Sequence, residues 1–351
     1  MNYFLRLTCV LFVLFLSSCH SFAQQKDNYS AKIDSLIKVT SPRSFNGVVY
    51  IQQNGKTKYS KAFGYSNFNT KEPLKISDRF STMSIAKQVT AVLVLTEVEK
   101  GTIDLQHTVR NYLPNFKYSW ADSVTVHQLL NNTSGISSES LDKPLKFSPG
   151  SNFSYSNPGY SLLGEILEKQ SKKSYQQLVT ALFKKCGMNN SSYPSESAQK
   201  TLTKGHTVKI DGTFRVNEKI NFEPSLYFGS NLIVTAPDLA KWNEKLHNGK
   251  LLKSETYKLM TSYSITNTHI LFSDKPIGYG YGLRINDKAA IKEIGHTGFH
   301  PSEGFTAVNL YYPASNTSVI VMENQANENF DIAYYFEQQI RRIVLKSNLL
   351  K

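Results

Sequence analysis

Residues 84–101 read SIAKQVTAVLVLTEVEKG. A mostly apolar run follows Ser84 and Lys87, and Gly101 ends it. This pattern predicts a buried helix over residues 85–100, because a glycine just past the last turn commonly ends a helix. Ser84 then lies at the N-terminus of that helix. Lys87 lies one turn later on the same face, so its amine can reach the serine oxygen.

A serine and a lysine in this arrangement can form part of an acyl-transfer site. The serine hydroxyl is a weak nucleophile until a base accepts its proton, and the tetrahedral intermediate needs hydrogen-bond donors for its oxyanion. Lys87 is a candidate base. The free N–H groups and the positive dipole end of a helix N-terminus make the backbone N–H of Ser84 a candidate oxyanion donor. The pair alone is equally compatible with an N-cap and a solvated lysine.

The Ser-x-x-Lys spacing occurs three more times, at Ser35/Lys38, Ser140/Lys143 and Ser197/Lys200. The first pair lies in an amphipathic stretch, the second runs directly into a proline, and the third lies in a polar run. We interpret all three as solvated helix faces or loops. Only the serine of the opening stretch precedes a buried helix, so the other pairs are not candidates for chemistry.

A second motif, Tyr155-Ser156-Asn157, supplies further polar groups. It lies between a Ser-Pro-Gly turn at 148–150 and a helix-like stretch over 160–169. A tyrosine close to a lysine ammonium can have its pKa lowered from about 10, which makes Tyr155 a second candidate general base. Asn157 would orient the lysine or bind a substrate amide.

The Tyr-x-Asn spacing also occurs at residues 65–67. This string follows two alternating stretches, 48–53 and 58–63, that flank Asn54-Gly55. Such a pattern predicts a β-hairpin, because Asn-Gly suits the tight turn that joins two strands. We therefore interpret residues 65–67 as a strand-end turn without a chemical role.

The third motif, His296-Thr297-Gly298, occurs once in the chain. Alternating, β-rich sequence surrounds it, and strands are predicted over 281–285, 305–310 and 317–322. The motif is therefore expected on or beside a strand. A glycine at this place would let a ligand approach the backbone closely. The backbone N–H of Phe299, just beyond, is the second candidate oxyanion donor.

Together the three motifs resemble those of the serine β-lactamase and DD-peptidase superfamily, on the branch of class C β-lactamases and related carboxypeptidases and esterases. Residues 125–135 (TVHQLLNNTSG) and 153–164 (FSYSNPGYSLLG) are similar to family stretches as well. The resemblance implies an α/β (α+β) fold, in which helices flank an antiparallel sheet and a helical domain is inserted. We expect the α/β domain over 24–100 and 225–351 and the helical domain over 101–224.

The resemblance also implies roles for individual residues. Ser84 would be the nucleophile, and Lys87 and Tyr155 would share the acid–base work, with the general base undecided between them. Asn157 and His296 would position substrate and lysine. A substrate carboxylate would be bound by Thr297, together with Arg284 unless that residue is a surface strand arginine.

Two residues depart from the family pattern. His296 stands where β-lactamases usually carry lysine, and a neutral imidazole binds a carboxylate less firmly than an ammonium does. Asn132 stands where a histidine is common. The histidine makes the motif more similar to a soluble DD-carboxypeptidase than to a dedicated β-lactamase.

The function predicted on this basis is serine hydrolysis through an acyl-enzyme, with no metal or cofactor. The substrate is expected to be a small molecule or a peptide, such as a D-alanyl cell-wall peptide, while D-amino-acid amides, small esters and β-lactams remain alternatives. Another class of function stays open: a penicillin-sensing or envelope-binding module without turnover. The chain has no GxSxG, GxxxxGK or HExxH motif, and no helix is expected to bring His296 and His300 to one metal.

The N-terminus predicts an exported protein. Arg6 precedes an apolar run over 7–16, which is too short to span a membrane and is typical of a secretory signal. Cleavage after Ala23 would give a periplasmic or secreted chain with a signal peptide over residues 1–23. Processing at Cys19 would instead give a lipid-anchored chain, and only then would a membrane be a partner. We favour the first alternative.

Charge and cysteine content agree with that expectation. The chain has 351 residues and a formal net charge of +13, and its lysines are scattered rather than clustered. Such a basic surface suits contact with acidic envelope polymers, and nucleic acid is not expected as a partner of an exported protein. Two of the three cysteines lie in the signal region, which leaves Cys186 without a partner for an intrachain disulfide.

Overall fold

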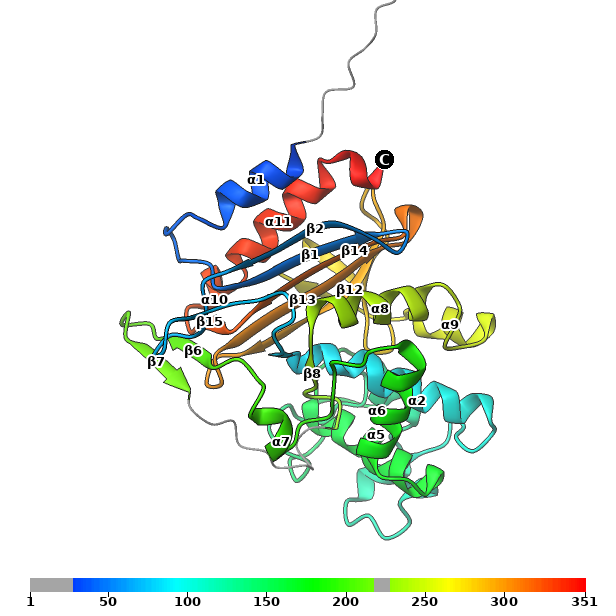
Figure 1. Ribbon diagram of the computed structural model, residues 1–351. Coiled ribbons are helices and arrows are strands. Elements are labelled where there is room, and N and C mark those ends of the chain that lie inside the picture. Colours follow the sequence, from blue (N-terminus) through cyan, green and yellow to red (C-terminus); the bar gives the residue numbers. More distant parts are fainter. Residues whose placement is uncertain (1–27, 218–227) are drawn as a thin grey trace, which may run out of the picture.

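A mixed α/β fold is built around one antiparallel sheet in the computed structural model, which describes residues 28–217 and 228–351. Its strand order is β2-β1-β14-β13-β12-β11-β10-β9 (Figure 1). The strands are β1 (Gly47–Gln53), β2 (Lys56–Phe63), β9 (Thr266–His269), β10 (Ser273–Tyr279), β11 (Arg284–Asn286), β12 (Glu293–His300), β13 (Phe305–Tyr312) and β14 (Thr317–Glu323). The hairpin predicted around Asn54-Gly55 is confirmed as β1 and β2. Segments that are far apart in the sequence meet in this sheet, because β1 pairs with β14 and Val48 lies opposite Met322.

Helices cover both faces of the sheet. Two helices, α1 (Tyr29–Leu36) and α11 (Tyr335–Leu345), pack on one face, while α2 (Ala86–Glu99) and α8 (Ala236–His247) lie on the other (Figure 1). The two faces follow from the alternation of side chains along each strand. In β1, the side chain of Val48 joins the α2 side and that of Val49 joins the α11 side.

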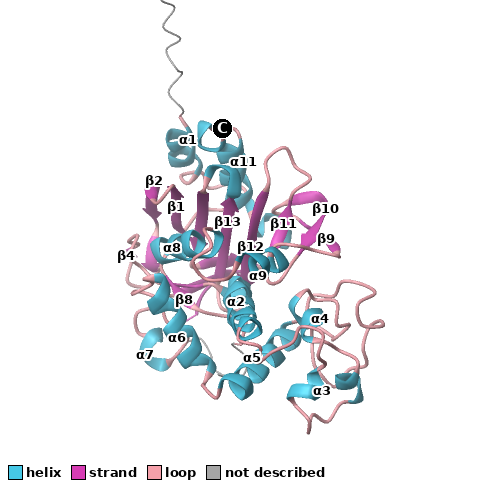
Figure 2. Ribbon diagram, turned by 90° about the vertical axis from the view of Figure 1, so that its right-hand side faces the viewer, coloured by secondary structure: helices cyan, strands magenta, loops and turns pink. Residues whose placement is uncertain are grey.

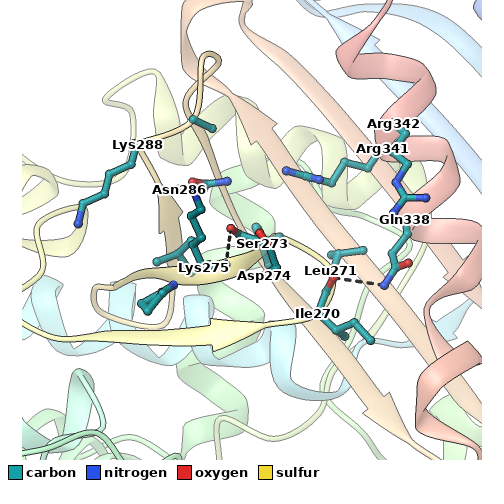
Figure 3. A pocket seen from close by; sticks show the side chains of 14 residues that line it. Ile270, Leu271, Ser273, Asp274, Lys275, Asn286, Lys288, Gln338, Arg341 and Arg342 are labelled. Carbon is teal, nitrogen blue, oxygen red and sulfur yellow. Dashed lines mark hydrogen bonds between the residues drawn. The ribbon is translucent and has the colours of Figure 1, made fainter.

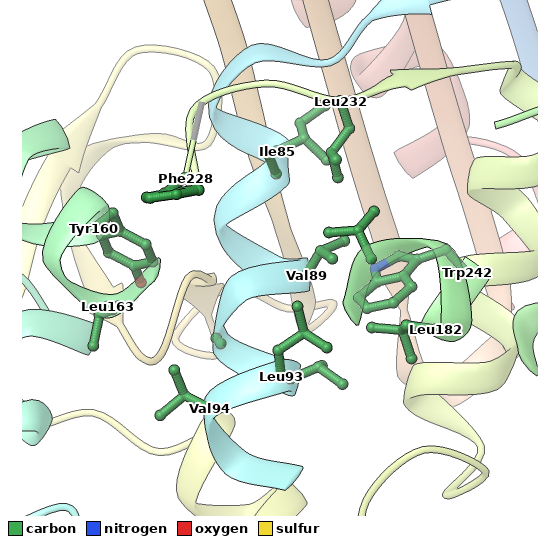
Figure 4. Close-up of a cluster of buried hydrophobic side chains, with 14 of the residues drawn as sticks. Ile85, Val89, Leu93, Val94, Tyr160, Leu163, Leu182, Phe228, Leu232 and Trp242 are labelled. Atoms are coloured by element: carbon green, nitrogen blue, oxygen red, sulfur yellow. The ribbon is translucent and has the colours of Figure 1, made fainter. Parts of the chain in front are cut away.

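The helix predicted over 85–100 is confirmed as α2, and it is buried on nearly all sides. A helix that is apolar all round needs partners all round. Figure 4 shows Val89 and Leu93 of α2 close to Trp242 of α8, with Tyr160 on the opposite side of the helix. Further helices are α3 (Val109–Tyr112), α4 (Val126–Leu130), α5 (Asn157–Ser171), α6 (Tyr175–Cys186), α7 (Glu196–Gln199) and α9 (Ser254–Met260), of which α5, α6 and α9 contact α2. Figure 2 shows α3 to α7 gathered beyond α2, away from the sheet.

The division into an α/β domain and an inserted helical domain stays a prediction, and one segment departs from it. Strands β6 (Gly205–Val208) and β7 (Phe214–Asn217) fall inside the range predicted to be helical. β6 pairs in parallel with β15 (Gln325–Asn327), the strand that directly follows β14 in the chain, and it pairs with β7 on its other side. The predicted boundary at 224/225 and the signal region with Cys19 and Ala23 lie outside the described residues.

Two smaller expectations can be compared with the structure. Residues 65–67 form strand β3, which pairs with β4 (Glu72–Pro73), so the prediction of a simple turn was wrong. Cys186 is buried and free, and burial raises the pKa of its thiol to about 11. None of the helices within the described ranges has the length and apolar character that a membrane crossing requires.

The strand predicted over 281–285 begins only at Arg284, because a turn precedes it. Gly282 has φ +65, a conformation that favours glycine. A Cβ atom at this position would lie 2.6 Å from the backbone oxygen of Lys87. The turn between β10 and β11 therefore packs directly on the first turn of α2.

This close approach can be tested by comparing two glycines of similar φ. Gly249 has φ +68, but nothing lies within 4 Å of the Cβ that a substitution would add. We expect Gly249→Ala to lower the free energy of unfolding by about 1 kcal/mol through backbone strain alone. Gly282→Ala should lower it by clearly more, because the new methyl group also displaces α2. Urea unfolding followed by tryptophan fluorescence measures both, and equal losses would show that the contact with Lys87 is not tight.

Candidate active site

Ser84 and Lys87 lie together as their spacing predicts. Ser84 occupies the 3-10 turn η1 (Met83–Ile85), which leads directly into α2. The Lys87 Nζ atom lies 3.3 Å from the Ser84 Oγ atom. The preceding residue, Met83, has φ +50, an uncommon backbone conformation for a side chain other than glycine. The serine is thus presented from a strained turn at the start of a buried helix.

The Lys87 amine is fully buried and has two further oxygen partners. It donates to the Asn157 Oδ1 atom at 2.7 Å and to the backbone oxygen of Gly229 at 3.1 Å. Both of these atoms are acceptors only. A neutral amine has two N–H groups, so when both are given to these acceptors its lone pair is left to face the Ser84 hydroxyl. The arrangement orients a neutral Lys87 as a proton acceptor.

Burial also favours the neutral amine. Removal from water lowers the pKa of Lys87 to about 7, and the positive charge of Arg284 acts in the same direction. The first cause is the larger one. Near neutral pH, a substantial fraction of Lys87 is therefore unprotonated and able to accept a proton.

Tyr155 lies against the same lysine, but its pKa moves opposite to the prediction. The Lys87 Nζ atom lies 4.8 Å from the centre of the Tyr155 ring. Burial raises the pKa of Tyr155 to about 12, and the nearby Ser84 hydroxyl and Arg284 charge only partly oppose that rise. Its buried hydroxyl makes no hydrogen bond within the described residues. The expectation of a lowered tyrosine pKa was wrong because desolvation outweighs the neighbouring positive charge.

Asn132, noted above only as a departure from the family pattern, holds the backbone around Tyr155. Its side-chain oxygen accepts the N–H of Ser156 at 3.0 Å, and its backbone oxygen accepts the N–H of Ser154 at 2.9 Å. Asn132 itself has φ +60, which asparagine tolerates better than most residues. The neighbours of Tyr155 on both sides are thus fixed by one asparagine.

His296 lies on β12 as expected, with both ring nitrogens engaged. Its Nδ1 atom lies 2.7 Å from the backbone oxygen of Thr297, which can only accept, so Nδ1 carries the proton. Its Nε2 atom then accepts from the Tyr279 hydroxyl at 3.2 Å. Burial, followed by the charge of Arg284, holds the pKa of His296 well below its usual value. A neutral imidazole with no free nitrogen adds no positive charge for a substrate.

Arg284 is not a surface residue, since only 6% of it is exposed. Its Nη1 atom donates to the Asn267 Oδ1 atom at 3.3 Å, while its Nε atom is buried without a partner. In the part of the chain that the structure describes, no carboxylate pairs with it. Its charge lowers the pKa values of Lys87 and His296, which places it within electrostatic reach of both. Arg284 is thus a buried cation with unused donors beside the site.

The Thr297 hydroxyl has a fixed orientation because of a histidine that the motifs did not indicate. The Nδ1 atom of His269 accepts the N–H of Leu271 at 3.2 Å, so its Nε2 atom carries the proton. That Nε2 lies 3.1 Å from the Thr297 Oγ1 atom and donates to it. The hydroxyl proton of Thr297 remains to be donated elsewhere. His269 precedes Thr297 by a long stretch of chain and belongs to no motif, so the sequence offered no signal for it.

Gly298 allows a close backbone approach within the fold. A Cβ atom there would lie 2.1 Å from the backbone oxygen of Thr82, in the segment just before Ser84. The glycine therefore lets β12 approach the turn that carries Ser84, while the approach of a ligand at this position stays a prediction. The ring of Phe299 packs against Phe330. The backbone N–H groups of Ser84 and Phe299 stay predicted oxyanion donors.

The three rejected Ser-x-x-Lys pairs lie away from this constellation. Ser35 and Ser197 are exposed, and the loop lysine Lys143 is exposed as well. Across residues 28–217 and 228–351, no group of three or more His, Cys, Asp or Glu side chains is arranged to hold a metal ion. The described site is therefore built from Ser84, Lys87, Tyr155 and the residues that orient them.

Comparison with known proteins identifies similar sequences. The family model described as Beta-lactamase matches residues 35–340. Penicillin-binding protein 4* of Bacillus subtilis is 30% identical over 190 residues, which are 47% of this chain and 42% of that protein. Protein flp of Staphylococcus aureus is 24% identical over 311 residues, 80% of this chain and 59% of that protein. The chain thus spans about half the length of these curated relatives.

Solved structures agree on the fold. A D-amino acid amidase from Ochrobactrum anthropi, crystallised with L-phenylalanine, superposes with a TM-score of 0.77. It is 19% identical and matches 90% of this chain and 98% of its own. At this level of identity the likeness concerns the fold, an antiparallel sheet flanked by helices.

The buried amine makes a testable contribution to stability. The pKa of Lys87 is about 7 in the fold, against about 10.4 for a free lysine. Between these values the unfolded state binds more protons, so the free energy of unfolding rises with pH. We expect this one group to add about 2 kcal/mol between about pH 7 and about pH 9. Lys87→Met should lack that increase in urea unfolding.

Lys292→Met is the matched control, because Lys292 is exposed on the surface. It should keep the pH dependence of the native chain. If Lys87→Met also kept it, the amine would have to remain charged in the fold, and its assignment as a neutral base would be wrong.

Proposed function

This chain belongs to the Beta-lactamase family of serine hydrolases, and we propose that it is an exported peptidase that cleaves an amide bond close to a free carboxylate. The substrate class proposed is that of D-alanyl peptides, as for a DD-carboxypeptidase or D-amino-acid peptidase. The observation that carries the proposal is Arg284, a buried guanidinium with unused donors and no carboxylate partner in the described chain. Such a cation is costly unless an anion joins it.

A substrate carboxylate would satisfy several groups at once. A guanidinium can bind a carboxylate through two parallel hydrogen bonds, and the bond is stronger because both partners are charged. The Thr297 hydroxyl accepts from His269, so its own proton can be donated either to the neighbouring Tyr334 hydroxyl or to the substrate carboxylate. His296 is neutral and both its nitrogens are engaged, so it offers no positive charge to the substrate carboxylate. Arg284 would supply that charge instead, in place of the lysine that β-lactamases usually have at the position of His296.

The acylation step follows from the arrangement around Lys87. The neutral amine accepts the Ser84 hydroxyl proton while the serine oxygen attacks the substrate carbonyl. The backbone N–H groups of Ser84 and Phe299 would bind the oxyanion. The carbon–nitrogen bond then breaks, and the leaving amine takes a proton from the Tyr155 hydroxyl. The Lys87 ammonium then gives the tyrosine oxygen the proton that it took from Ser84. The raised pKa of Tyr155 suits this role, because the phenol is protonated at neutral pH.

Deacylation reverses the roles with water in place of the amine. Lys87 is neutral again and accepts a proton from water as the water oxygen adds to the acyl carbonyl. The bond between the acyl carbon and the Ser84 oxygen breaks, the carboxylic acid product leaves, and the serine oxygen takes the proton that Lys87 accepted from water. The fixed acceptors Asn157 and Gly229 keep the Lys87 lone pair directed at this position in both steps. Because Lys87 can act as a base again after acylation, this arrangement favours repeated turnover. A sensor that is acylated only once would not need it.

The names of similar proteins support the proposed substrate class, and the N-terminal sequence supports the proposed export. The names penicillin-binding protein and D-amino acid amidase belong to similar proteins and favour D-amino-acid chemistry for this chain. The signal-like residues 1–23 support export to the periplasm or beyond, with anchoring through Cys19 as the alternative. A cell-wall peptide would be the natural macromolecular source of such a substrate.

A substrate panel tests this proposal. Purified protein would be given a D-Ala-D-Ala peptide, a D-amino-acid amide, a p-nitrophenyl ester and a chromogenic cephalosporin, with Ser84→Ala as control. Multiple turnovers of the peptide, lost in Ser84→Ala, are expected. Ester or cephalosporin turnover without peptide cleavage would favour an esterase or a weak β-lactamase, and a stable stoichiometric adduct would favour the sensor.

Arg284→Gln tests carboxylate recognition. Loss of a charge-assisted pair should raise KM for the D-Ala-D-Ala peptide by about 10- to 100-fold. The matched substrate is the same peptide ending in a carboxamide, for which KM should change by less than about threefold. Steady-state kinetics on both peptides decide the matter. A similar increase for both would mean that Arg284 only supports the fold.

The pH profile provides an independent test of the base. Lys87 must be neutral, so kcat/KM for the uncharged p-nitrophenyl ester should fall about tenfold per pH unit below the lysine pKa, which is about 7. Arg284→Gln removes a charge that lowers this pKa, so its acid limb should move to higher pH. An acid limb that stays in place, or that moves to lower pH, would contradict the assignment of Lys87.

A further inference from the structure

A sizeable pocket of the described chain lies apart from Ser84 and Lys87. It has a volume of about 760 Å³ and opens on the α11 face of the sheet, between the β9–β10 hairpin, the loop after β11 and helix α11 (Figure 3). Neither Ser84 nor Lys87 lines it. A volume of this size is within the range of pockets that bind small molecules.

A buried ion pair fixes one wall of this pocket. Glu293 is fully buried and accepts from the Arg341 Nε atom at 2.8 Å, with a second bond from Arg341 Nη2. The Asn286 amide adds a bond to Glu293 at 2.9 Å, and the Tyr312 hydroxyl adds one at 3.3 Å. The carboxylate therefore has little acceptor capacity left, and it holds the Arg341 guanidinium in place.

The held guanidinium keeps donors for a ligand. Arg341 Nη1 makes no hydrogen bond to any residue of the described ranges. Figure 3 shows the Arg341 and Asn286 side chains pointing toward one another from α11 and β11. A preorganised guanidinium edge binds an anion at a smaller entropic cost than a free side chain.

The rim of the pocket adds positive charge, and its wall adds apolar surface. Three exposed cations line it, and none forms an ion pair among the described residues: Lys275, Lys288 and Arg342. Asp274 is the one acidic residue among its described lining residues. The apolar wall is formed by Leu271, Phe272 and Ile277, which are almost fully buried.

We propose that this pocket is a second binding site, for a small organic anion that carries an apolar substituent. A carboxylate or phosphate group would lie at the Arg341 edge and the cationic rim. The apolar part would lie against Leu271 and Phe272. Charge complementarity steers such a ligand, and the apolar contact separates it from inorganic ions.

Hydrogen bonds link the hairpin that forms the pocket wall to Thr297 of the candidate active site. The N–H of Leu271 donates to His269, and His269 donates to the Thr297 hydroxyl. The Gln338 side chain of α11 donates to the backbone oxygen of Ile270 at 3.2 Å, which ties the hairpin to the other wall (Figure 3). A ligand that shifts residues 270–271 therefore changes how Thr297 is held.

Calorimetric titration with phenylphosphate tests the binding site. Inorganic phosphate and benzyl alcohol serve as comparators that carry only the charge or only the ring. The test variant is Lys275→Ala/Lys288→Ala/Arg342→Ala, and the control is Lys56→Ala/Lys173→Ala/Lys200→Ala, which removes three exposed charges elsewhere. All six lysine or arginine side chains are exposed, so both proteins should fold.

We expect the test variant to bind phenylphosphate at least about tenfold more weakly, and the control to bind within about twofold of the native chain. Phenylphosphate should bind more tightly than either comparator. Equal binding by the two triple variants would overturn the proposal. So would benzyl alcohol binding as tightly as phenylphosphate.

Coupling is tested by kinetics and rests on the proposed function. In each protein, KM for the D-Ala-D-Ala peptide is measured with and without saturating phenylphosphate. The ratio of the two KM values should differ by about fivefold between the native chain and the test variant. The variant corrects for competition at Arg284, which both proteins share. No difference between them would overturn the coupling. Calorimetric binding is measured without turnover, so a failure of the peptidase assignment would be recognised separately.

Discussion

The buried amine of Lys87 is the constraint on which the rest of the site depends. Burying an ammonium away from water is energetically unfavourable. Two oxygen acceptors, on the Asn157 side chain and the Gly229 backbone, partly offset this cost, and the lowered pKa of Lys87 makes the neutral amine accessible. Each acceptor comes from a separate part of the chain, one from the start of α5 and one from Gly229. The packing of α2 against these segments therefore determines both the charge and the direction of the amine. Stability and chemistry are linked at this one atom.

Arg284 extends that constraint through its electric field. Burial is the larger cause of the lowered pKa values of Lys87, His296 and His269, and the charge of Arg284 acts on all three in the same direction. A ligand anion beside Arg284 would offset this field. Substrate binding would then raise the proton affinity of Lys87, which would favour proton transfer from the serine once the substrate is in place. In the proposed function, recognition of the carboxylate at Arg284 and activation of Ser84 by Lys87 would be connected through this field.

The motif residues could be recognised from the sequence because each lies in a local pattern. A lysine one helical turn from a serine must share its face, and the apolar run after Ser84 requires burial. The Ser84–Lys87 contact, the helix and the hairpin followed from such rules, although catalytic roles remain predictions. What could not be predicted depends on contacts between distant segments. The burial of Tyr155 reverses the direction of its pKa shift, His269 reaches Thr297 from another strand, and Gly298 accommodates Thr82.

The pairing of β1 with β14 has a consequence for how the protein is made. Val48 and Met322 are neighbours in the sheet but lie near opposite ends of the chain. A growing chain therefore completes its helices long before the strand that closes the sheet is available, and contacts so distant in sequence form slowly. The final fold, with β12 placed beside Ser84, is assembled only after the C-terminal strands have been released from the ribosome. Ser84 and its helix are thus present early in synthesis, while the strand that completes the candidate site around them is among the later parts to form.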